Sequence, residues 1–193
     1  MSIKSRMSLD VRRLVYIAVL TALVFVVQLI PIRPGGMSLA VFTLAIIVIG
    51  AALCGVGASA WLGLVFGIAV MVLPETALFW SYSWAGTLIT VLLKGLLAGI
   101  ASGAIYKLLE RINRYIAVIA AAVIAPIVNS GIFFIGCMIF FQGYFATFAA
   151  EASVNVATFV IVFVIGINFL IELAVSAVFA PVVYRIINIK KKA

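Results

Sequence analysis

Residues 86–108 read GTLITVLLKGLLAGIASGAIYKL, a run of apolar and small residues with one charge, Lys94, near its middle and a second, Lys107, at its end. About 20 such residues, wound as a helix, are long enough to cross the ~30 Å hydrocarbon core of a bilayer. A strand of a membrane barrel would instead show about ten residues of alternating polarity. The run therefore predicts a transmembrane helix and an integral membrane protein of the all-α class.

The composition of the whole chain agrees with a membrane protein. The 193 residues are 67% hydrophobic and 9% charged, and the mean hydropathy is +1.40. Soluble domains carry about 25% charged residues, so the composition excludes a soluble enzyme. A disordered chain is excluded as well, because such chains are poor in apolar residues. No loop is long enough for a soluble domain, and residues 1–193 are expected to form a single membrane domain.

Five further apolar runs lie on either side of this one. The second and third runs of the chain are short and would form one re-entrant unit in an alternative topology, but Gly55 and Gly57 between them favour a tight hairpin. We therefore predict six transmembrane helices, with boundaries uncertain by several residues for the two short runs. In chain order the predicted spans are 14–30, 39–53, 58–73, 86–108, 115–141 and 156–187.

The positions of the positive charges predict the orientation of these spans. Cytoplasmic loops of membrane proteins are enriched in Lys and Arg, and six spans place 11 of the 13 cations on the side of both termini. Both termini are thus expected in the cytoplasm and the chain in the plasma membrane. Topology also explains the net charge of +8, so nucleic acid is not an expected partner. The 11 cations are Lys4, Arg6, Arg12, Arg13, Lys107, Arg111, Arg114, Arg185, Lys190, Lys191 and Lys192.

Several classes of chemistry are excluded by the residues that the chain contains. It has no histidine, and its two cysteines, Cys54 and Cys137, stand alone in apolar stretches, so no metal site, catalytic triad or cofactor is expected. It has no Gly-x-x-x-x-Gly-Lys-Ser/Thr motif, so the chain is not expected to hydrolyse ATP itself. We expect a transport protein rather than an enzyme, driven by an ion gradient or by another subunit.

Polar residues inside the spans are the candidates for a functional site, because such groups are costly in a membrane and usually face a cavity or one another. Lys94, Asn129 and Glu172 each lie 13 to 15 residues from the cytoplasmic cation at the end of their own span. At about 1.5 Å per residue, each is roughly 20 Å above the inner face. Three helices thus bring polar groups to one layer in the outer half of the bilayer. The alternative for Lys94 and Glu172 is an ion pair with no other role.

Four other residues are weaker candidates for the same site. Asn168 precedes Glu172 by four residues and shares its helix face. Tyr82 and Trp84 belong to an aromatic segment that is either a pocket wall or an ordinary belt at the headgroup level. Arg33 lies in a Pro- and Gly-containing loop that is either an outer lid or a simple turn.

Three short motifs resemble those of a known family. They are Ala18-Val-Leu-Thr-Ala22 in the first span, Leu92-Leu-Lys-Gly-Leu-Leu-Ala-Gly99 in the fourth, and Ala125-Pro-Ile-Val-Asn-Ser-Gly131 in the fifth. Together with the length, the six spans and the cationic N-terminal region, they make the chain similar to the substrate-binding S component of an energy-coupling-factor (ECF) vitamin transporter. The resemblance covers nearly the whole chain.

The resemblance implies a function and a set of partners. An S component captures a water-soluble vitamin from outside and associates with a transmembrane coupling subunit and two cytoplasmic ATPase subunits. ATP hydrolysis by those partners then drives the S component to topple in the membrane and release the vitamin inside. The face that carries Ala18 and Ala22 would meet the coupling subunit, and the vitamin would bind near the outer surface.

The polar residues suggest which vitamin this is. Lys94 is suited to a carboxylate, Asn129 to an amide or hydroxyl, and Glu172 to hydroxyl or amide N–H donors. Pantothenate combines these groups, with cobalamin, folate and riboflavin as alternatives. A different class, a self-sufficient ion-coupled permease with Lys94 and Glu172 as a proton or ion relay, also stays open.

Overall fold

The computed structural model describes the backbone of residues 3–30 and 40–192 and the side chains of residues 11–30, 40 and 42–188. These residues are helical almost throughout and contain no strand, so the predicted all-α class is confirmed. The elements are α1 (Ile3–Gln28), α2 (Val41–Cys54), α3 (Val56–Met71), a 3-10 turn (Pro74–Thr76), α4 (Ala77–Tyr82), α5 (Trp84–Leu109), α6 (Arg114–Phe140), α7 (Gln142–Glu151), α8 (Val156–Phe159), a π-helical segment (Val160–Gly166) and α9 (Ile167–Lys192).

Each predicted span is helical, but the helices differ in length. Four described helices are long and apolar enough to cross a membrane, and a fifth crossing results if α3 and the segment Pro74–Tyr82, bent from it by 75°, form one broken span. With 14 residues, α2 is only about 21 Å long. The protein is therefore a multi-pass membrane protein with four or five spans by this criterion, and the count of six stays a prediction.

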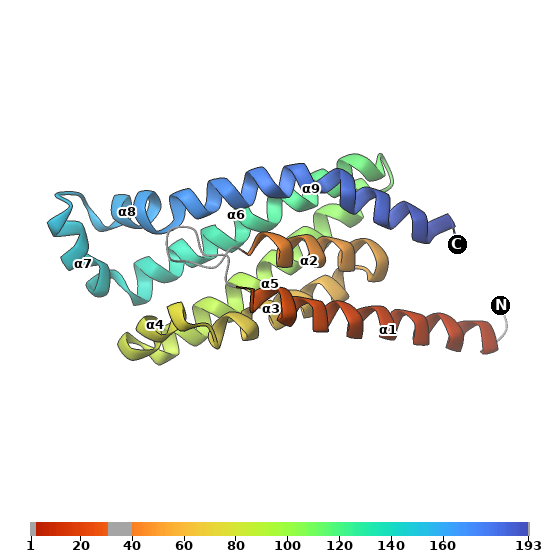
Figure 1. The fold of residues 1–193 in the computed structure, drawn as a ribbon, viewed down its shortest axis with the longest axis horizontal. Helices are drawn as coiled ribbons and strands as arrows, with labels where there is room; N and C mark the ends of the chain where they lie inside the picture. The colour runs from red at the N-terminus through yellow and green to blue at the C-terminus, as the bar shows by residue number, and fades with distance from the viewer. Residues whose placement is uncertain (1–2, 31–39, 193) are drawn as a thin grey trace.

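The helices form an elongated bundle whose two ends differ (Figure 1). α1 begins and α9 ends at the same end of the bundle, whereas α4, α7 and α8 lie at the other end. α5 packs against α3 on one side and against α6 on the other, and α9 packs on α6 and α2. The N-terminal half of α5, which carries Lys94, is thereby surrounded by other helices.

Side-chain caps fix where the helices of the bundle begin. Ser83 accepts a hydrogen bond from a backbone N–H in the first turn of α5, and Asn113 accepts two in the first turn of α6. Asn155 accepts one in the first turn of α8. Short polar side chains at this position satisfy the free N–H groups of a helix start. These caps therefore fix the residues at which α5 and α6, the helices of Lys94 and Asn129, begin.

Glycines allow α3 and α5 to touch backbone to backbone. A Cβ atom on Gly63 of α3 would overlap the carbonyl oxygen of Gly95, and a Cβ on Gly95 would overlap that of Gly63. One turn further along, a Cβ on Gly99 would overlap the carbonyl of Ser59. Small residues at such spacing let membrane helices approach closely, so this ladder serves internal packing.

A substitution in this contact should destabilise the fold. Gly95→Ala adds a methyl group against a backbone atom that cannot rotate away, and overpacking of this kind costs about 1–3 kcal/mol. Gly131 is the matched control, because it lies inside α6 with open space around its Cα, and Gly131→Ala should be neutral or stabilising. Thermal unfolding in detergent should therefore show a lower Tm for Gly95→Ala only. An equal Tm for the two variants would contradict the packing described here.

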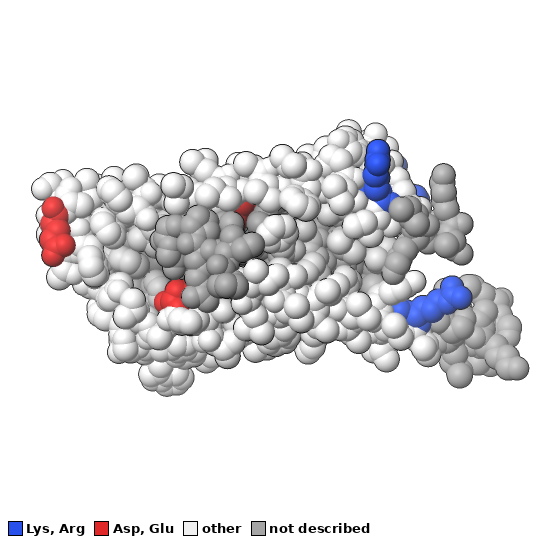
Figure 2. All heavy atoms as spheres, in the orientation of Figure 1, with Lys and Arg blue, Asp and Glu red and all other residues white. Residues whose placement is uncertain are grey.

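Charge is distributed unevenly along the bundle. The visible Lys and Arg side chains gather at the end where α1 begins and α9 ends, and the visible acidic side chains lie in the other half of the bundle (Figure 2). Glu75 lies in the turn before α4, and Glu151 ends α7. Arg13 of α1 also donates a hydrogen bond to the carbonyl of Cys54 at the C-terminus of α2. The positively charged end thus includes Arg13, whose hydrogen bond connects α1 with the turn between α2 and α3.

Candidate functional site

A cavity lies between the helices in the half of the bundle away from the chain termini. The centre of a water molecule can occupy about 80 Å³ within it, which exceeds the ~10–15 Å³ that one water needs. Its wall combines apolar side chains with convergent polar groups, as small-molecule sites do. The polar residues that line it are Gln28, Glu75, Thr76, Thr87, Thr90, Lys94, Asn129, Ser130, Asn168 and Glu172.

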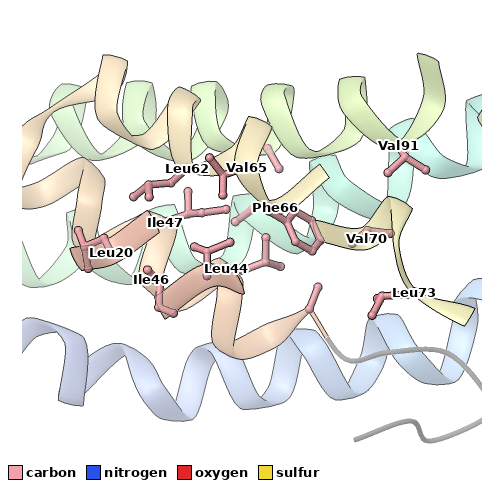
Figure 3. Packing of buried hydrophobic residues seen from close by; sticks show 14 residues of the cluster. Leu20, Leu44, Ile46, Ile47, Leu62, Val65, Phe66, Val70, Leu73 and Val91 are labelled. Atoms are coloured by element: carbon pink, nitrogen blue, oxygen red, sulfur yellow. The ribbon is translucent and has the colours of Figure 1, made fainter. Parts of the chain in front are cut away.

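The apolar part of the wall continues the hydrophobic core. Phe66, Val70 and Val91 belong to the buried cluster that joins α1, α2, α3, α5 and α6, and they also line the cavity. Figure 3 shows this cluster, with Phe66 beside Leu44 and Val70. The packed core therefore ends at the cavity, and this rigid support holds the polar groups in place.

Lys94 presents its ammonium group to the cavity. The Nζ atom lies 5.0 Å from the centroid of the Phe133 ring and 5.8 Å from that of Phe66, within the range of cation–π attraction. In the described part of the chain it has no hydrogen bond or ion pair, and Glu172 acts on it only through space. A direct ion pair between Lys94 and Glu172 is thus not formed, and the ammonium is available to an anion.

Glu172 is held by the start of α2. One carboxylate oxygen accepts a hydrogen bond of 3.0 Å from the backbone N–H of Ala40, and the residue is 4% exposed. The side chain of Asn129 lies beside the same carboxylate. Residues 132 positions apart in the sequence, from α9 and the beginning of α2, are therefore joined at the cavity wall.

The hydrogen bond between Glu172 and Ala40 gives a testable effect on stability. Glu172→Ala leaves the buried N–H of Ala40 without an acceptor, which should cost about 1–3 kcal/mol of unfolding free energy. Glu172→Gln keeps a carbonyl oxygen at the same place and should retain most of the stability. Thermal unfolding of the ligand-free protein checks the difference. If the Ala and Gln variants unfold at the same temperature, this hydrogen bond does not hold the start of α2.

Three buried oxygen atoms of threonine and asparagine side chains at the cavity have no hydrogen-bond partner within the described residues. They are Oγ1 of Thr90, Oδ1 of Asn129 and Oδ1 of Asn168. Buried polar atoms without a hydrogen bond are rare, and each calls for a water or a ligand. The cavity thus presents one cation, Lys94, two carboxylates, Glu75 and Glu172, and three oxygen atoms without a partner among the described residues. No group of three or more His, Cys, Asp or Glu that could hold a metal occurs among the described residues.

Lys94, Asn129, Asn168 and Glu172, predicted as site residues, all line this one cavity. Tyr82 and Trp84 do not line it. Their side chains are 49% and 68% exposed, and Tyr82 packs against the rings of Phe141 and Tyr144. From the same aromatic segment it is Phe79 that reaches the wall, where it meets Phe133 and Phe141 edge to face. Arg33 lies outside the described residues.

Six polar residues of the wall were not predicted as site residues: Gln28, Glu75, Thr76, Thr87, Thr90 and Ser130. Gln28 is an amide near the end of the first apolar run, a signal of the same kind as Asn129. The threonines gave no such signal in the sequence, because the hydroxyl of a helical threonine usually donates a hydrogen bond to a carbonyl of the preceding turn. Thr87 does so with Ser83, but Thr90 does not.

The docking prediction concerns a different surface. Ala18 and Ala22 are both exposed on α1, on the side away from the buried stripe of Leu20, Val24 and Gln28. A helix face with small exposed residues allows another helix to approach closely. The structure therefore leaves this face open, and its role as a docking surface stays a prediction.

Comparison with known protein families decides the class of protein. The model of the ECF transporter substrate-specific component family matches residues 12–184. The chain belongs to this family. An ECF substrate-specific component, or S component, is a transport subunit rather than an enzyme, and it works with an ECF module of ATPases and a coupling subunit. Neither the curated proteins nor the solved structures gave a significant match to this S component.

Proposed function

We propose that this S component captures a small, water-soluble carboxylate from outside the cell, and that pantothenate is the vitamin that fits best. The observation that carries the proposal is the set of groups at the cavity. Within the described residues, the ammonium of Lys94 has no hydrogen bond or ion pair, and the oxygen atoms of Thr90, Asn129 and Asn168 at the same cavity have no partner either. A ligand that satisfies this set needs one anionic end and several N–H or O–H donors.

Pantothenate meets this requirement group by group. Its carboxylate would pair with Lys94, and its amide N–H and two hydroxyl groups would supply donors to the three free acceptors. Its dimethyl carbon would contact Val164 and Ile165 of the wall. Cobalamin, folate and riboflavin are the alternatives. In the wall, Phe79 packs edge to face on Phe133 and on Phe141, so these rings do not form a flat slot, which favours a compact ligand over a planar ring system.

The orientation in the membrane is part of the same proposal. We place all six helical segments across the plasma membrane as one domain of residues 1–193, with both termini in the cytoplasm. The gathering of Lys and Arg at the end where α1 begins and α9 ends supports this, since positive charge marks the cytoplasmic side. The cavity then lies in the outer half of the bilayer, as a site loaded from outside requires.

Transport needs partners in this proposal. A transmembrane coupling subunit would dock on the exposed Ala18 and Ala22 face of α1, and two cytoplasmic ATPases would supply the energy for release inside. The S component by itself would bind its ligand without moving it across the membrane. This separates it from a self-sufficient permease, which would use Lys94 and Glu172 to relay ions.

Two measurements on the purified chain test the proposal. Calorimetric titration with pantothenate, riboflavin, folate and cobalamin should show one site per chain for pantothenate and weaker or no binding for the others. Vesicles that contain the chain alone should take up no pantothenate under a proton or sodium gradient. Failure to bind any of the four vitamins would refute the proposed substrate class. Gradient-driven uptake by the chain alone would refute the proposal that transport requires the ATPase subunits.

A further inference from the structure

Gln28 connects the cavity with the helix that carries the exposed alanines. It lies at the C-terminal end of α1, is 3% exposed, and lines the cavity. Most of α1 faces outward, and the buried stripe Leu20, Val24 and Gln28 is the side by which the helix meets the bundle. The side chains of Leu20 and Val24 pack in the hydrophobic core, whereas the side chain of Gln28 lines the cavity.

The orientation of the Gln28 amide follows from its partner on α2. The hydroxyl of Thr43 donates a hydrogen bond of 2.9 Å to Oε1 of Gln28, and Thr43 is fully buried. A glutamine side chain has one acceptor oxygen and an NH₂ group with two donors. Because the oxygen is engaged by Thr43, the NH₂ group is the part that remains for the cavity.

Among the described residues, no group accepts a hydrogen bond from the NH₂ group of Gln28. Within the described residues, Thr43 is the one hydrogen-bond partner of the Gln28 side chain. An amide donor on a side chain that lines a cavity gains free energy when a ligand oxygen accepts its hydrogen bond. Oδ1 of Asn129 and Oδ1 of Asn168 are acceptors without a partner among the described residues, and the NH₂ group of Gln28 adds a donor to the same cavity.

We infer that Gln28 is a ligand-binding residue of this S component, donating through its NH₂ group to an oxygen of the ligand, and that Thr43 positions it. The inference rests on the proposed function, because it assumes that the cavity binds the transported molecule. It adds a requirement to the ligand: an acceptor oxygen, of a carbonyl, carboxylate or hydroxyl group, opposite the end of α1. It also puts a ligand contact on the helix that presents Ala18 and Ala22, about two turns away.

Two variants at position 28 separate donor from acceptor. Gln28→Glu keeps an oxygen for Thr43 and nearly the same shape but removes the NH₂ group, whereas Gln28→Leu removes both functions. Calorimetry with pantothenate should show about tenfold or more weaker binding for each. Thr21→Val is the matched control, since it removes a hydrogen bond of α1, to Trp61, that lies away from the cavity. Its affinity should equal that of the wild type.

The positioning role of Thr43 needs a measurement that a purely structural role would not move. Thr43→Val should weaken pantothenate binding severalfold, and Thr43→Ser, which keeps the hydroxyl, should restore it. In the Gln28→Leu background Thr43→Val should cause no further loss, because there is no amide left to orient. Equal additional losses in both backgrounds would show that Thr43 acts independently of Gln28 and would overturn its assignment.

Hydrogen exchange gives a second readout of the contact. Pantothenate should slow amide exchange at the C-terminal end of α1 in the wild type and leave it unchanged in Gln28→Leu. If the wild type binds pantothenate and both Gln28 variants bind it equally well, the inference is wrong and the proposed function stands. If the wild type binds none of the four vitamins, the proposed function fails and the inference falls with it.

Discussion

Replacing Lys94 by Met should weaken pantothenate binding by about a hundredfold or more, the largest loss expected from any single side chain of the site. Loss of one partner from a buried pair of charges costs about 2–5 kcal/mol, and each 1.4 kcal/mol is a factor of about ten in affinity. Methionine keeps the unbranched shape of lysine and removes the charge, so packing against Phe66 and Phe133 is retained. Isothermal titration calorimetry on the detergent-purified protein measures the effect.

Lys107→Met is the control for this substitution. Lys107 lies on the same helix, α5, in its last turn, and its side chain is exposed. The control loses the same charge from the same helix and should bind pantothenate as the wild type does. If Lys94→Met binds as tightly as Lys107→Met, the ligand makes no ion pair with Lys94 and the assignment of a carboxylate ligand is wrong.

The double variant Ala18→Leu and Ala22→Leu should abolish ATP-driven uptake while it leaves ligand binding intact. Each leucine adds bulk to a face where only a methyl group now separates the α1 backbone from an approaching helix, and close approach is what small residues permit. The face is on the outside of the bundle, away from the cavity, so the affinity for pantothenate should not change. Co-purification of the coupling subunit and vesicle uptake with the full set of subunits measure the two effects.

Two alanines on another helix provide the matched control. Ala174 and Ala177 are exposed on α9, which lies across the bundle from α1 (Figure 1). Replacing both by leucine makes the same chemical change on a different face and should leave uptake unchanged. Uptake that survives in the α1 variant, or is lost equally in the α9 variant, would show that the α1 face is not the docking surface.

The main polar residues of the cavity could be predicted from the sequence because a polar side chain inside a membrane span is energetically unfavourable. Lys94, Asn129 and Glu172 interrupt long apolar runs, and a polar group there must face something other than lipid. Counting residues along each helix sufficed to bring them to one depth, since the rise per residue of a helix is constant. The same logic applied to Gln28 would have added it.

Other features depend on tertiary contacts that no local pattern encodes. Whether the hydroxyl of Thr90 turns to its own backbone or to the cavity is decided by packing. The same holds for the aromatic segment, where Phe79 turns inward and Trp84 outward. The π-helical segment Val160–Gly166 contains no proline and carries two wall residues, Val164 and Ile165. Its wider turns change the register before Asn168, and nothing in the apolar run indicated them.

Because α2 is short and the chain bends after α3, the lengths of the apolar runs do not by themselves give the number of membrane crossings. The sequence predicts that the third span ends before Pro74. In the structure the chain continues into α4, where Trp80 donates a hydrogen bond to the carbonyl of Met71. This contact folds α4 back against the end of α3. The number of crossings is therefore a property of how these helices sit in the bilayer, not of the length of the apolar runs.

Native mass spectrometry of the purified chain, incubated with pantothenate and compared with the Lys94→Met variant, tests most directly whether these polar groups bind one small molecule. We expect a single pantothenate adduct on each wild-type chain and no adduct on the variant. A wild type without an adduct, or equal occupancy in the two proteins, would contradict the claim that these polar groups bind pantothenate.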